Sequence, residues 1–416
     1  MSTPGGVQEA LLQALGAQMQ AQRAGNLTLG RGTLGGRNIR IAMVENRFAS
    51  GAVGTLEAEP LAALLKVATQ EKSAVVIFLD SAGAKVSEGL KALGAFRTLY
   101  QAGLQATLAG VSMATVLGRN CYGGASMLAH LAPERLFSPN TQLAMSGPAI
   151  LAAGAGLSAL DEMFRAMAEV TLAPASRARS TTANTVWSPA MDVAAWLKTA
   201  LAPRGDATTA WRFRHEALGA RFEKGIPETP WEAVRRKDLE KIYMSCEARE
   251  SQGLLEGRGR RPEGDEAFIG LVGKQPLGAA RAWKFAERAW QHADRPPERM
   301  EVFLDCASHA PRLDDEKVVL TEYIVDMAFA LASLASKGTR VGLTILGQAG
   351  GGVYVALAAP VGRVASVYGA DIQVLPGAAV AAILGAAGES TANFEAYRAA
   401  GVADEEIKLG FVPGTT

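Results

Sequence analysis

The sequence predicts an α/β fold with largely parallel strands that occurs twice in one chain. β-branched apolar runs alternate with helical patterns along most of the sequence, as in parallel sheets whose faces are covered by helices. The strand-like run VIFLD at residues 76–80 returns as VFLD at residues 302–305, and the glycine-rich turn at residues 117–125 returns at residues 346–353. Because the recurring parts keep their order, the sequence indicates two copies of one fold.

The first copy begins with residues 1–25, whose apolar side chains recur at helical spacing. The polar loop at residues 80–89 joins a buried strand to the helix that follows it. The elements expected after the first helix are a half-buried strand over residues 37–44, a helix over 59–68, a buried strand over 74–79, a helix that ends near residue 102 and a strand over 114–117.

The character of the chain changes between residues 203 and 264. Charged residues crowd the first part of this segment, and residues 256–264 are polar and glycine-rich, which favours helical hairpin material followed by a loop or linker. Arg258, Arg260 and Arg261 are either a phosphate-binding cluster or, in the interpretation that we favour, part of a solvated linker.

The strand and helix pattern then restarts. Residues 268–272 resemble an edge strand, and a second buried strand, a long apolar helix and a third strand lead to the second glycine turn. The predicted parts of the chain are a first domain over residues 1–202, a helical and linker segment over 203–264 and a second domain over 265–416.

The composition excludes several functional classes. The 42 basic and 41 acidic residues of the 416 nearly cancel, so no electrostatic footprint for nucleic acid or an anionic membrane surface is expected. The three cysteines are far apart and the four histidines lack metal-ligand spacing, so we expect neither a disulfide framework nor a metal site. No targeting pattern stands at the N-terminus and no apolar run suits a membrane helix, so we expect a cytoplasmic protein without membrane or nucleic-acid partners.

Each copy places two loops at the carboxyl ends of neighbouring buried strands, where ligands of open parallel sheets bind. We expect the two loops of a copy to converge and to present backbone N–H groups to one oxygen atom. The expected donors are Gly83 or Ala84 with Gly123 or Gly124 in the first copy, and Ser308, His309 or Ala310 with Gly351 and Gly352 in the second.

Paired backbone donors suit an oxygen that becomes negative during a reaction, as the carbonyl oxygen of a thioester does when an enolate forms. Such chemistry requires no nucleophile, and the sequence carries no GxSxG nucleophile elbow. Each well-placed donor contributes on the order of a hundredfold to a thousandfold in rate. The candidate donors therefore predict an oxyanion hole in each copy. Gly123 and Gly124 are alternatively glycines required only for tight packing.

The motifs of the first copy resemble the β subunit of biotin-independent malonate decarboxylase. The second copy resembles that enzyme's γ subunit more loosely, and both subunits belong to the carboxyltransferase branch of the crotonase superfamily. The motifs that carry the resemblance are GTLGGR at residues 32–37, the loop at 80–89, CYGG at 121–124 and SGP at 146–148, with the stretches 271–273, 305–316 and 346–358 in the second copy.

The resemblance implies duplicated crotonase-like (carboxyltransferase) ββα-superhelix domains, with β-like and γ-like components joined in one chain. It implies decarboxylation of a malonyl thioester on an acyl carrier protein to an acetyl thioester and CO2. The expected partners are the acyl carrier protein and acyltransferase subunits, in an oligomer. The expected substrate arm is a phosphopantetheine-type thioester carried by acyl carrier protein or CoA, and no cofactor is expected to be bound covalently, because the AMKM context of a biotin-carrying lysine is absent.

Three further residues of these loops, Lys85, Tyr122 and Ala310, are candidates for substrate binding. Lys85 is a candidate to attract the malonyl carboxylate or a phosphate of the carrier arm, and the alternative is a solvated lysine. His309 is a candidate to bind the carboxylate or to return a proton to the enolate carbon, and the alternative is a histidine on a surface loop.

Other polar residues near these loops favour structural roles. Cys121 is expected to be a small core residue rather than a nucleophile, because no base stands near it in the sequence. Glu88 is expected to cap a helix or form an ion pair, and Asp80 and Asp305, which end matching strands, are expected to cap turns.

The sequence leaves three functions open. The leading hypothesis is a decarboxylase of malonyl-type thioesters that works through an enolate. The second is a biotin-dependent acyl-CoA carboxyltransferase component, whose two oxyanion holes would serve the thioester and the ureido oxygen. The third is a non-catalytic scaffold subunit, which the two intact glycine turns disfavour because a scaffold has no need of paired donors.

Overall fold

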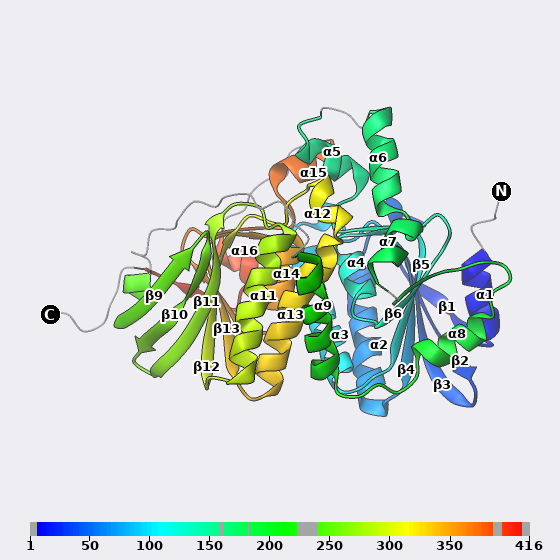
Figure 1. Ribbon diagram of the computed structural model, residues 1–416, viewed down its shortest axis with the longest axis horizontal. Helices are drawn as coiled ribbons and strands as arrows, with labels where there is room; N and C mark the ends of the chain where they lie inside the picture. The colour runs from blue at the N-terminus through cyan, green and yellow to red at the C-terminus, as the bar shows by residue number, and fades with distance from the viewer. Residues whose placement is uncertain (1–5, 158–160, 182, 223–238, 386–392, 410–416) are drawn as a thin grey trace.

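The computed structural model describes residues 6–157, 161–181, 183–222, 239–385 and 393–409. These residues form two sheets of eight strands with helices packed between and around them (Figure 1). Each sheet begins with an antiparallel strand meander and continues with parallel strands, so the predicted α/β fold with largely parallel strands is confirmed.

The first sheet has the strand order β1-β2-β3-β4-β5-β6-β8, and β7 pairs with β5 beside this path. Its strands are β1 (Gln18–Ala24), β2 (Leu27–Leu34), β3 (Arg37–Val44), β4 (Ala74–Ser81), β5 (Met113–Tyr122), β6 (Glu134–Phe137), β7 (Gln142–Ala144) and β8 (Asn184–Val186).

The second sheet has the strand order β9-β10-β11-β12-β13-β14-β16, and β15 pairs with β13 beside this path. Its strands are β9 (Ser245–Ser251), β10 (Leu254–Arg261), β11 (Gly264–Lys274), β12 (Arg299–Cys306), β13 (Arg340–Gly350), β14 (Arg363–Val367), β15 (Asp371–Gln373) and β16 (Glu405–Ile407). Every strand of the first sheet thus has a counterpart in the second, which confirms the duplication.

The helices repeat in the same order. In the first copy, α2 (Thr55–Glu71), α3 (Leu90–Leu108), α4 (Gly124–Ala129) and α5 (Pro148–Gly154) follow β3, β4, β5 and β7. Their counterparts are α11 (Ala279–Asp294), α13 (Leu320–Ser336), α14 (Gly351–Ala358) and α15 (Gly377–Leu384). The remaining helices are α1 (Gly6–Ala14), α6 (Glu162–Leu172), α7 (Pro174–Ser180), α8 (Val193–Ala200), α9 (Ala207–Phe222), α10 (Leu239–Ile242), α12 (Leu313–Lys317), α16 (Phe394–Ala399) and the short 3-10 helices η1 (Ala49–Gly51) and η2 (Val86–Glu88).

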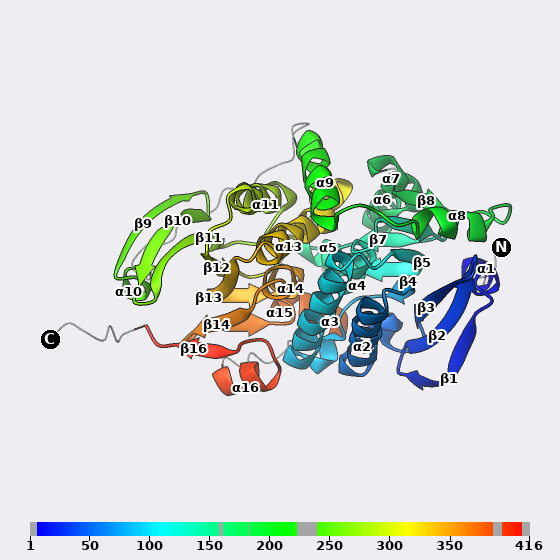
Figure 2. The ribbon, with the colours of Figure 1, turned by 90° about the horizontal axis from the view of Figure 1, so that it is seen from below.

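The two copies share one hydrophobic core. Helices α3 and α4 of the first copy pack against α14 and α13 of the second, in the layer between the two sheets (Figure 2). One cluster of buried apolar side chains runs through this layer and includes Phe96 and Met127 from the first copy and Tyr323 and Leu331 from the second. The loops at the carboxyl ends of the strands are therefore held against one another across the boundary between the copies.

Two stretches that the sequence analysis assigns to other structures are strands. Residues 18–24, expected to continue the first helix, form β1, and residues 256–261, expected to be loop or linker, belong to β10. The glycines of β10 suggest a loop in the sequence, but in the structure they make room for aromatic rings. A Cβ on Gly257 would lie 2.6 Å from the ring of Phe268, and one on Gly259 would lie 2.4 Å from the ring of Tyr243.

Because β10 pairs with β11, β11 lies between β10 and β12 and is not the edge strand that the sequence predicts. Arg258, Arg260 and Arg261 lie on β10 and are not part of a linker, although Arg258 and Arg260 are exposed to solvent. Arg261 forms an ion pair with Glu266 at 2.6 Å. The helical part of the charged segment is confirmed by α9, and residues 223–238 lie outside the described residues. The three-part division of the chain stays a prediction, with β9 and β10 placed in the second sheet.

Candidate active site at the glycine turns

The two glycine turns each contain a glycine with the same positive φ angle. Gly123 stands between the end of β5 and the start of α4 with φ of 53°, and Gly351 stands at the start of α14 with φ of 54°. Side chains other than glycine rarely adopt this left-handed conformation. The recurrence of glycine at these two positions therefore has a common structural cause.

Asp80 and Asp305 fix the strand ends that lead into the turns. The carboxylate of Asp80 accepts the N–H of Asn120 at 3.0 Å, and that of Asp305 accepts the N–H of Gln348 at 2.8 Å. Both strands are irregular here, since the register shifts after Leu79 and after Leu304. The two aspartates therefore join their strand ends to the neighbouring strands, and their turn-capping role stays a prediction.

In the first copy, most backbone N–H groups of the two loops already have acceptors. Gly83 donates to the Oγ of Ser81 at 3.1 Å, and Gly123 donates to the carbonyl oxygens of Ala144 and Met145 at 3.1 and 3.2 Å. The sequence analysis leaves open which glycine or alanine N–H faces a ligand, and these bonds remove Gly83 and Gly123 as donors.

Ala84 and Gly124 are the two remaining candidates for N–H donors to a ligand in the first copy. Val53 donates to the carbonyl oxygen of Gly83 at 2.8 Å and accepts from the N–H of Lys85 at 2.9 Å, a parallel bridge that turns the N–H of Ala84 to the opposite side. Within the described ranges, no hydrogen bond uses the N–H of Ala84 or of Gly124.

The two loops of the first copy meet closely. A Cβ on Gly83 would lie 3.2 Å from the nitrogen of Gly124 and 2.6 Å from the carbonyl oxygen of Tyr122. The structure thus brings the loop after β4 and the glycine turn together, as the topology predicts. The part that these residues play in a reaction stays a prediction.

The second copy repeats this arrangement in a buried form. Leu277 donates to the carbonyl oxygen of Ser308 and accepts from the N–H of Ala310, both at 2.8 Å, so His309 takes the place of Ala84. Residues 308–310, Gly351 and Gly352 are all buried. A Cβ on Gly352 would lie 2.1 Å from the Cε of Met145, so a side chain of the first copy fills the space beside the second turn.

His309 lies at the boundary between the copies and not on the surface. Only 6% of it is exposed, and its Nε2 lies 3.0 Å from the Oγ of Ser146 while its Nδ1 lies 3.2 Å from the Oγ of Ser308. Burial lowers the pKa of His309 to about 4, so the ring is neutral near pH 7. The surface-loop alternative is therefore wrong.

A buried ion pair, which the sequence analysis does not identify, supports this histidine. The carboxylate of Glu316 accepts the N–H of Ser146 at 2.9 Å and lies 3.4 Å from the guanidinium of Arg177, which also donates to the carbonyl oxygens of Leu143 and Glu316. Burial raises the pKa of Glu316 to about 7, although Arg177 opposes this effect. Arg177 belongs to a segment without a recognisable motif, so no sequence signal points to the pair.

The remaining candidates have defined contacts. Lys85 forms an ion pair with Glu88 at 3.0 Å, and Glu88 also accepts from the N–H of Thr55 at 2.8 Å, which confirms the capping and ion-pair role of Glu88. The hydroxyl of Tyr122 donates to the side chain of Gln142. Cys121 is fully buried and burial raises the pKa of its thiol well above the usual range, so its predicted core role is confirmed.

The first copy is similar to a known family. The model of the carboxyl transferase domain matches residues 7–166. The matched range contains the first glycine turn together with the loop after β4, and the sheet of the second copy repeats the strand topology of the first.

A curated relative of the carboxyl transferase domain is the acetyl-coenzyme A carboxylase carboxyl transferase subunit beta of Synechococcus sp. (strain JA-3-3Ab). It is 29% identical over 149 residues, which cover 36% of this chain and 48% of that protein. The chain spans about half the length of the curated relatives that it matches.

Among solved structures, the transcarboxylase 12S hexamer with methylmalonyl-coenzyme A and methylmalonic acid is similar with 17% identity and a TM-score of 0.39, over 96% of this chain and 86% of the other. A Pseudomonas malonate decarboxylase hetero-tetramer in complex with malonate is similar with 18% identity and a TM-score of 0.43, over 50% of this chain and 87% of the other. Likeness at this level does not bear on the reaction of this chain.

No helix in the described part of the chain combines the length and the apolar character that a membrane crossing requires. The described residues also hold no group of three or more histidine, cysteine, aspartate or glutamate side chains arranged to bind a metal ion.

Proposed function

We propose that the chain decarboxylates a malonyl-type acyl thioester, with the thioester oxygen bound by the N–H groups of Ala84 and Gly124. The observation that carries the proposal is the meeting of two loops at which both of these N–H groups lack an acceptor among the described residues. The carboxyl transferase match over the same residues supports chemistry at a carboxylated thioester.

The chemistry follows from the donors. The bond between the malonyl C2 and its carboxylate carbon breaks, CO2 leaves, and the electron pair moves into an enolate whose charge rests on the thioester oxygen. Preorganised N–H donors bind that oxygen more strongly as its charge develops, and the loss of one such donor costs about 2.7 to 4 kcal/mol of barrier lowering. A proton then adds to C2 and gives the acetyl thioester.

The buried neutral ring of His309 supports a positioning role. Binding a carboxylate by charge, or returning a proton as an acid, would require an imidazolium ring, which burial disfavours. Its hydrogen bond with Ser146 instead links the loops of the two copies, while Ser308 of its own loop holds the other ring nitrogen. In this proposal the proton for C2 comes from water, and His309 fixes the loop geometry.

The substrate arm and the partners are part of the proposal. A phosphopantetheine-type thioester, carried by acyl carrier protein or by CoA, would reach the first turn past Lys85, whose side chain is about one-third exposed. Acyl carrier protein and acyltransferase subunits would then act with this chain in a cytoplasmic oligomer.

The second candidate is a biotin-dependent carboxyltransferase component. The name of the Synechococcus relative favours it. The burial of the second turn speaks against it, because residues 308–310, Gly351 and Gly352 are buried, whereas Ala84 and Gly124 are partly exposed. One accessible hole is sufficient for decarboxylation, whereas carboxyl transfer between two carbonyl compounds uses two.

The test measures CO2 release from malonyl-acyl carrier protein and from malonyl-CoA, with and without avidin. Release that avidin does not inhibit supports decarboxylation. Release that requires biotin and stops with avidin supports carboxyl transfer and overturns the proposal. Absence of turnover of any acyl thioester, together with stable binding to partner subunits, favours the scaffold function.

A further inference from the structure

A pocket of about 480 Å³ lies at the opposite edge of the first sheet from the glycine turn. Residues 110–113 at the start of β5, and residues 130–133 with Arg135 at the start of β6, form its floor, so it lies at the amino ends of these strands. Helix α9 and residues Glu322 and Phe329 of α13 form the other walls. The volume falls in the range of pockets that hold small organic ligands.

The pocket has an excess of positive charge. The guanidinium groups of Arg135, Arg214 and Arg221 line it, and among its described lining residues Glu322 is the one carboxylate. Glu322 lies 3.6 Å from Arg214 and forms an ion pair with Arg221. Three cations against one anion leave an excess of two positive charges, and Arg204 at the rim is neutralised by Glu134 at 2.8 Å. Arg135 is only 2% exposed, so its charge is held in a site where water screens it poorly.

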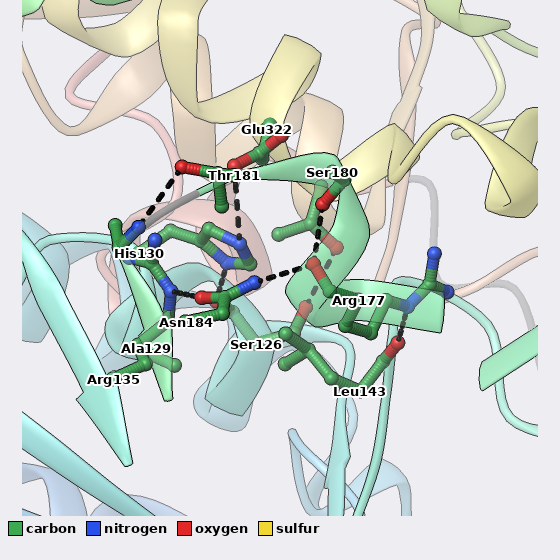
Figure 3. A network of polar contacts seen from close by, with 12 residues as sticks. Ser126, Ala129, His130, Arg135, Leu143, Arg177, Ser180, Thr181, Asn184 and Glu322 are labelled. Atoms are coloured by element: carbon green, nitrogen blue, oxygen red, sulfur yellow. Dashed lines mark hydrogen bonds and ion pairs between the residues drawn. The ribbon is translucent and has the colours of Figure 1, made fainter. Parts of the chain in front are cut away.

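His130 presents an unsatisfied nitrogen to the same pocket. Its Nδ1 lies 2.7 Å from the carbonyl oxygen of Ser126 and must donate, since a carbonyl oxygen only accepts. The Nε2 therefore carries a lone pair, is buried, and has no hydrogen-bond partner within the described chain. The carboxylate of Glu322 lies 4.0 Å from the Nε2, beyond hydrogen-bonding distance (Figure 3). A buried acceptor of this kind requires a donor from a ligand or from water.

Helix α9 shapes the pocket with alternating small and charged residues. Ala210, Arg214, Ala217 and Arg221 are spaced by four, three and four residues, so they share the face that lines the pocket. The alanines leave space between the two arginines. The indole of Trp211 stacks on the ring of Phe329 with 4.2 Å between ring centroids and adds an apolar wall.

We propose that this pocket binds a small amphipathic organic anion. A carboxylate or phosphate head group would contact Arg135 and Arg214, and an apolar body would lie against Trp211 and the alanine face of α9. A hydroxyl or amide N–H on the ligand would donate to the Nε2 of His130. The proposal does not depend on the reaction at the glycine turns, because the pocket lies at the other edge of the sheet.

The test uses octanoate and phenyl phosphate as probes, measured by isothermal titration calorimetry and by the shift in thermal unfolding. We expect one equivalent of at least one probe to bind with a Kd below about 1 mM, which corresponds to about 4 kcal/mol. Octanol, which lacks the charge, and inorganic phosphate, which lacks the apolar body, are expected to bind at least tenfold more weakly. Equal binding of inorganic phosphate and phenyl phosphate would overturn the amphipathic assignment.

Two variants locate the binding. Ala217→Trp fills the pocket from an exposed position on α9 and leaves every charge in place, so it is expected to weaken probe binding at least tenfold without unfolding the protein. Arg214→Gln is expected to weaken it similarly, and the exposed Arg165→Gln on α6 is the matched charge control. Absence of saturable binding of both probes, or binding that Ala217→Trp leaves unchanged, would show that the pocket is not the site.

Discussion

The hydroxyl of Ser146 lies 3.0 Å from the Nε2 of His309, although 163 positions separate them in the sequence. This hydrogen bond crosses from one copy of the fold to the other. The N–H of Ser146 donates at the same time to the buried carboxylate of Glu316 at 2.9 Å. The neutral ring of His309 thereby fixes the relative position of the two candidate loops without introducing a buried charge.

His309→Gln is expected to reduce the loss of stability on acidification. Burial lowers the pKa of His309 to about 4, so the folded state keeps the ring neutral while the unfolded chain protonates it below its ordinary pKa of 6.5. The stability that the neutral ring contributes is complete above pH 6.5 and declines as the pH falls toward 4. Urea unfolding at about pH 7.5 and about pH 4.5 measures the free energy of unfolding at each pH. We expect its decrease between the two pH values to be smaller in the variant by about 2.5 kcal/mol.

The matched control for this pH effect is His292→Gln. His292 is only partly buried, and burial also lowers its pKa. Glu316, whose raised pKa gives the opposite trend, is retained in both variants, so its contribution cancels in the comparison. If His292→Gln reduced the acid-induced loss of stability more than His309→Gln does, the assignment of this acid sensitivity to the boundary between the copies would be contradicted.

Gly352→Ala is expected to destabilise the protein unless Met145 is shortened at the same time. The new Cβ would lie 2.1 Å from the Cε of Met145 and 3.1 Å from the Sδ of Met127. Overpacking of this kind costs about 1 to 3 kcal/mol. Met145→Ala makes room, so the double variant is expected to be more stable than the sum of the single effects predicts. Denaturant unfolding of the four proteins forms a double-mutant cycle, and strict additivity would show that Met145 does not fill the second turn.

The sequence predicts the duplicated fold and the meeting of the loops because these follow from patterns that recur. The run before Asp80 and the run before Asp305 are short, continuous apolar stretches typical of buried strands, and parallel strands bring their carboxyl ends to one edge. The strand β10 is missed because glycine marks turns in a sequence, whereas Gly257 and Gly259 serve here to make room for the rings of Phe268 and Tyr243. That contact is tertiary and has no local signature.

The details of the candidate site depend equally on tertiary contacts. Ser81 and the bridge to Val53 decide which N–H groups remain without an acceptor. The glycine pattern of the sequence indicates neither of these partners. The burial of His309 results from the packing of the second copy on the first. The pairing of Arg177 with Glu316 joins residues 139 positions apart, so the sequence offers no periodicity from which to infer it.

Cys121→Ala is expected to retain turnover. The thiol lies in the glycine turn, but burial raises its pKa far above the range in which a thiolate forms near neutral pH. We expect the native protein to resist iodoacetamide and the variant to lose about 1 kcal/mol of stability. Steady-state assays of CO2 release check the prediction. A folded Cys121→Ala protein without turnover would favour a mechanism with a cysteine nucleophile.

Ala84→Pro tests the proposed oxyanion hole most directly, because proline removes one backbone donor and leaves the rest of the loop sequence unchanged. The N–H of Ala84 has no acceptor in the described structure, so its removal breaks no hydrogen bond of the fold. We expect kcat to fall by about a hundredfold to a thousandfold, with a smaller change in KM. Ala84→Ser keeps the donor and is expected to retain most of the activity. If thermal unfolding shows that the proline variant is not folded, Gly83→Ala tests the same contact, since its Cβ would meet the carbonyl oxygen of Tyr122 at 2.6 Å and separate the loops. Near-normal kcat in a folded Ala84→Pro protein would exclude the N–H of Ala84 as a donor to the enolate oxygen.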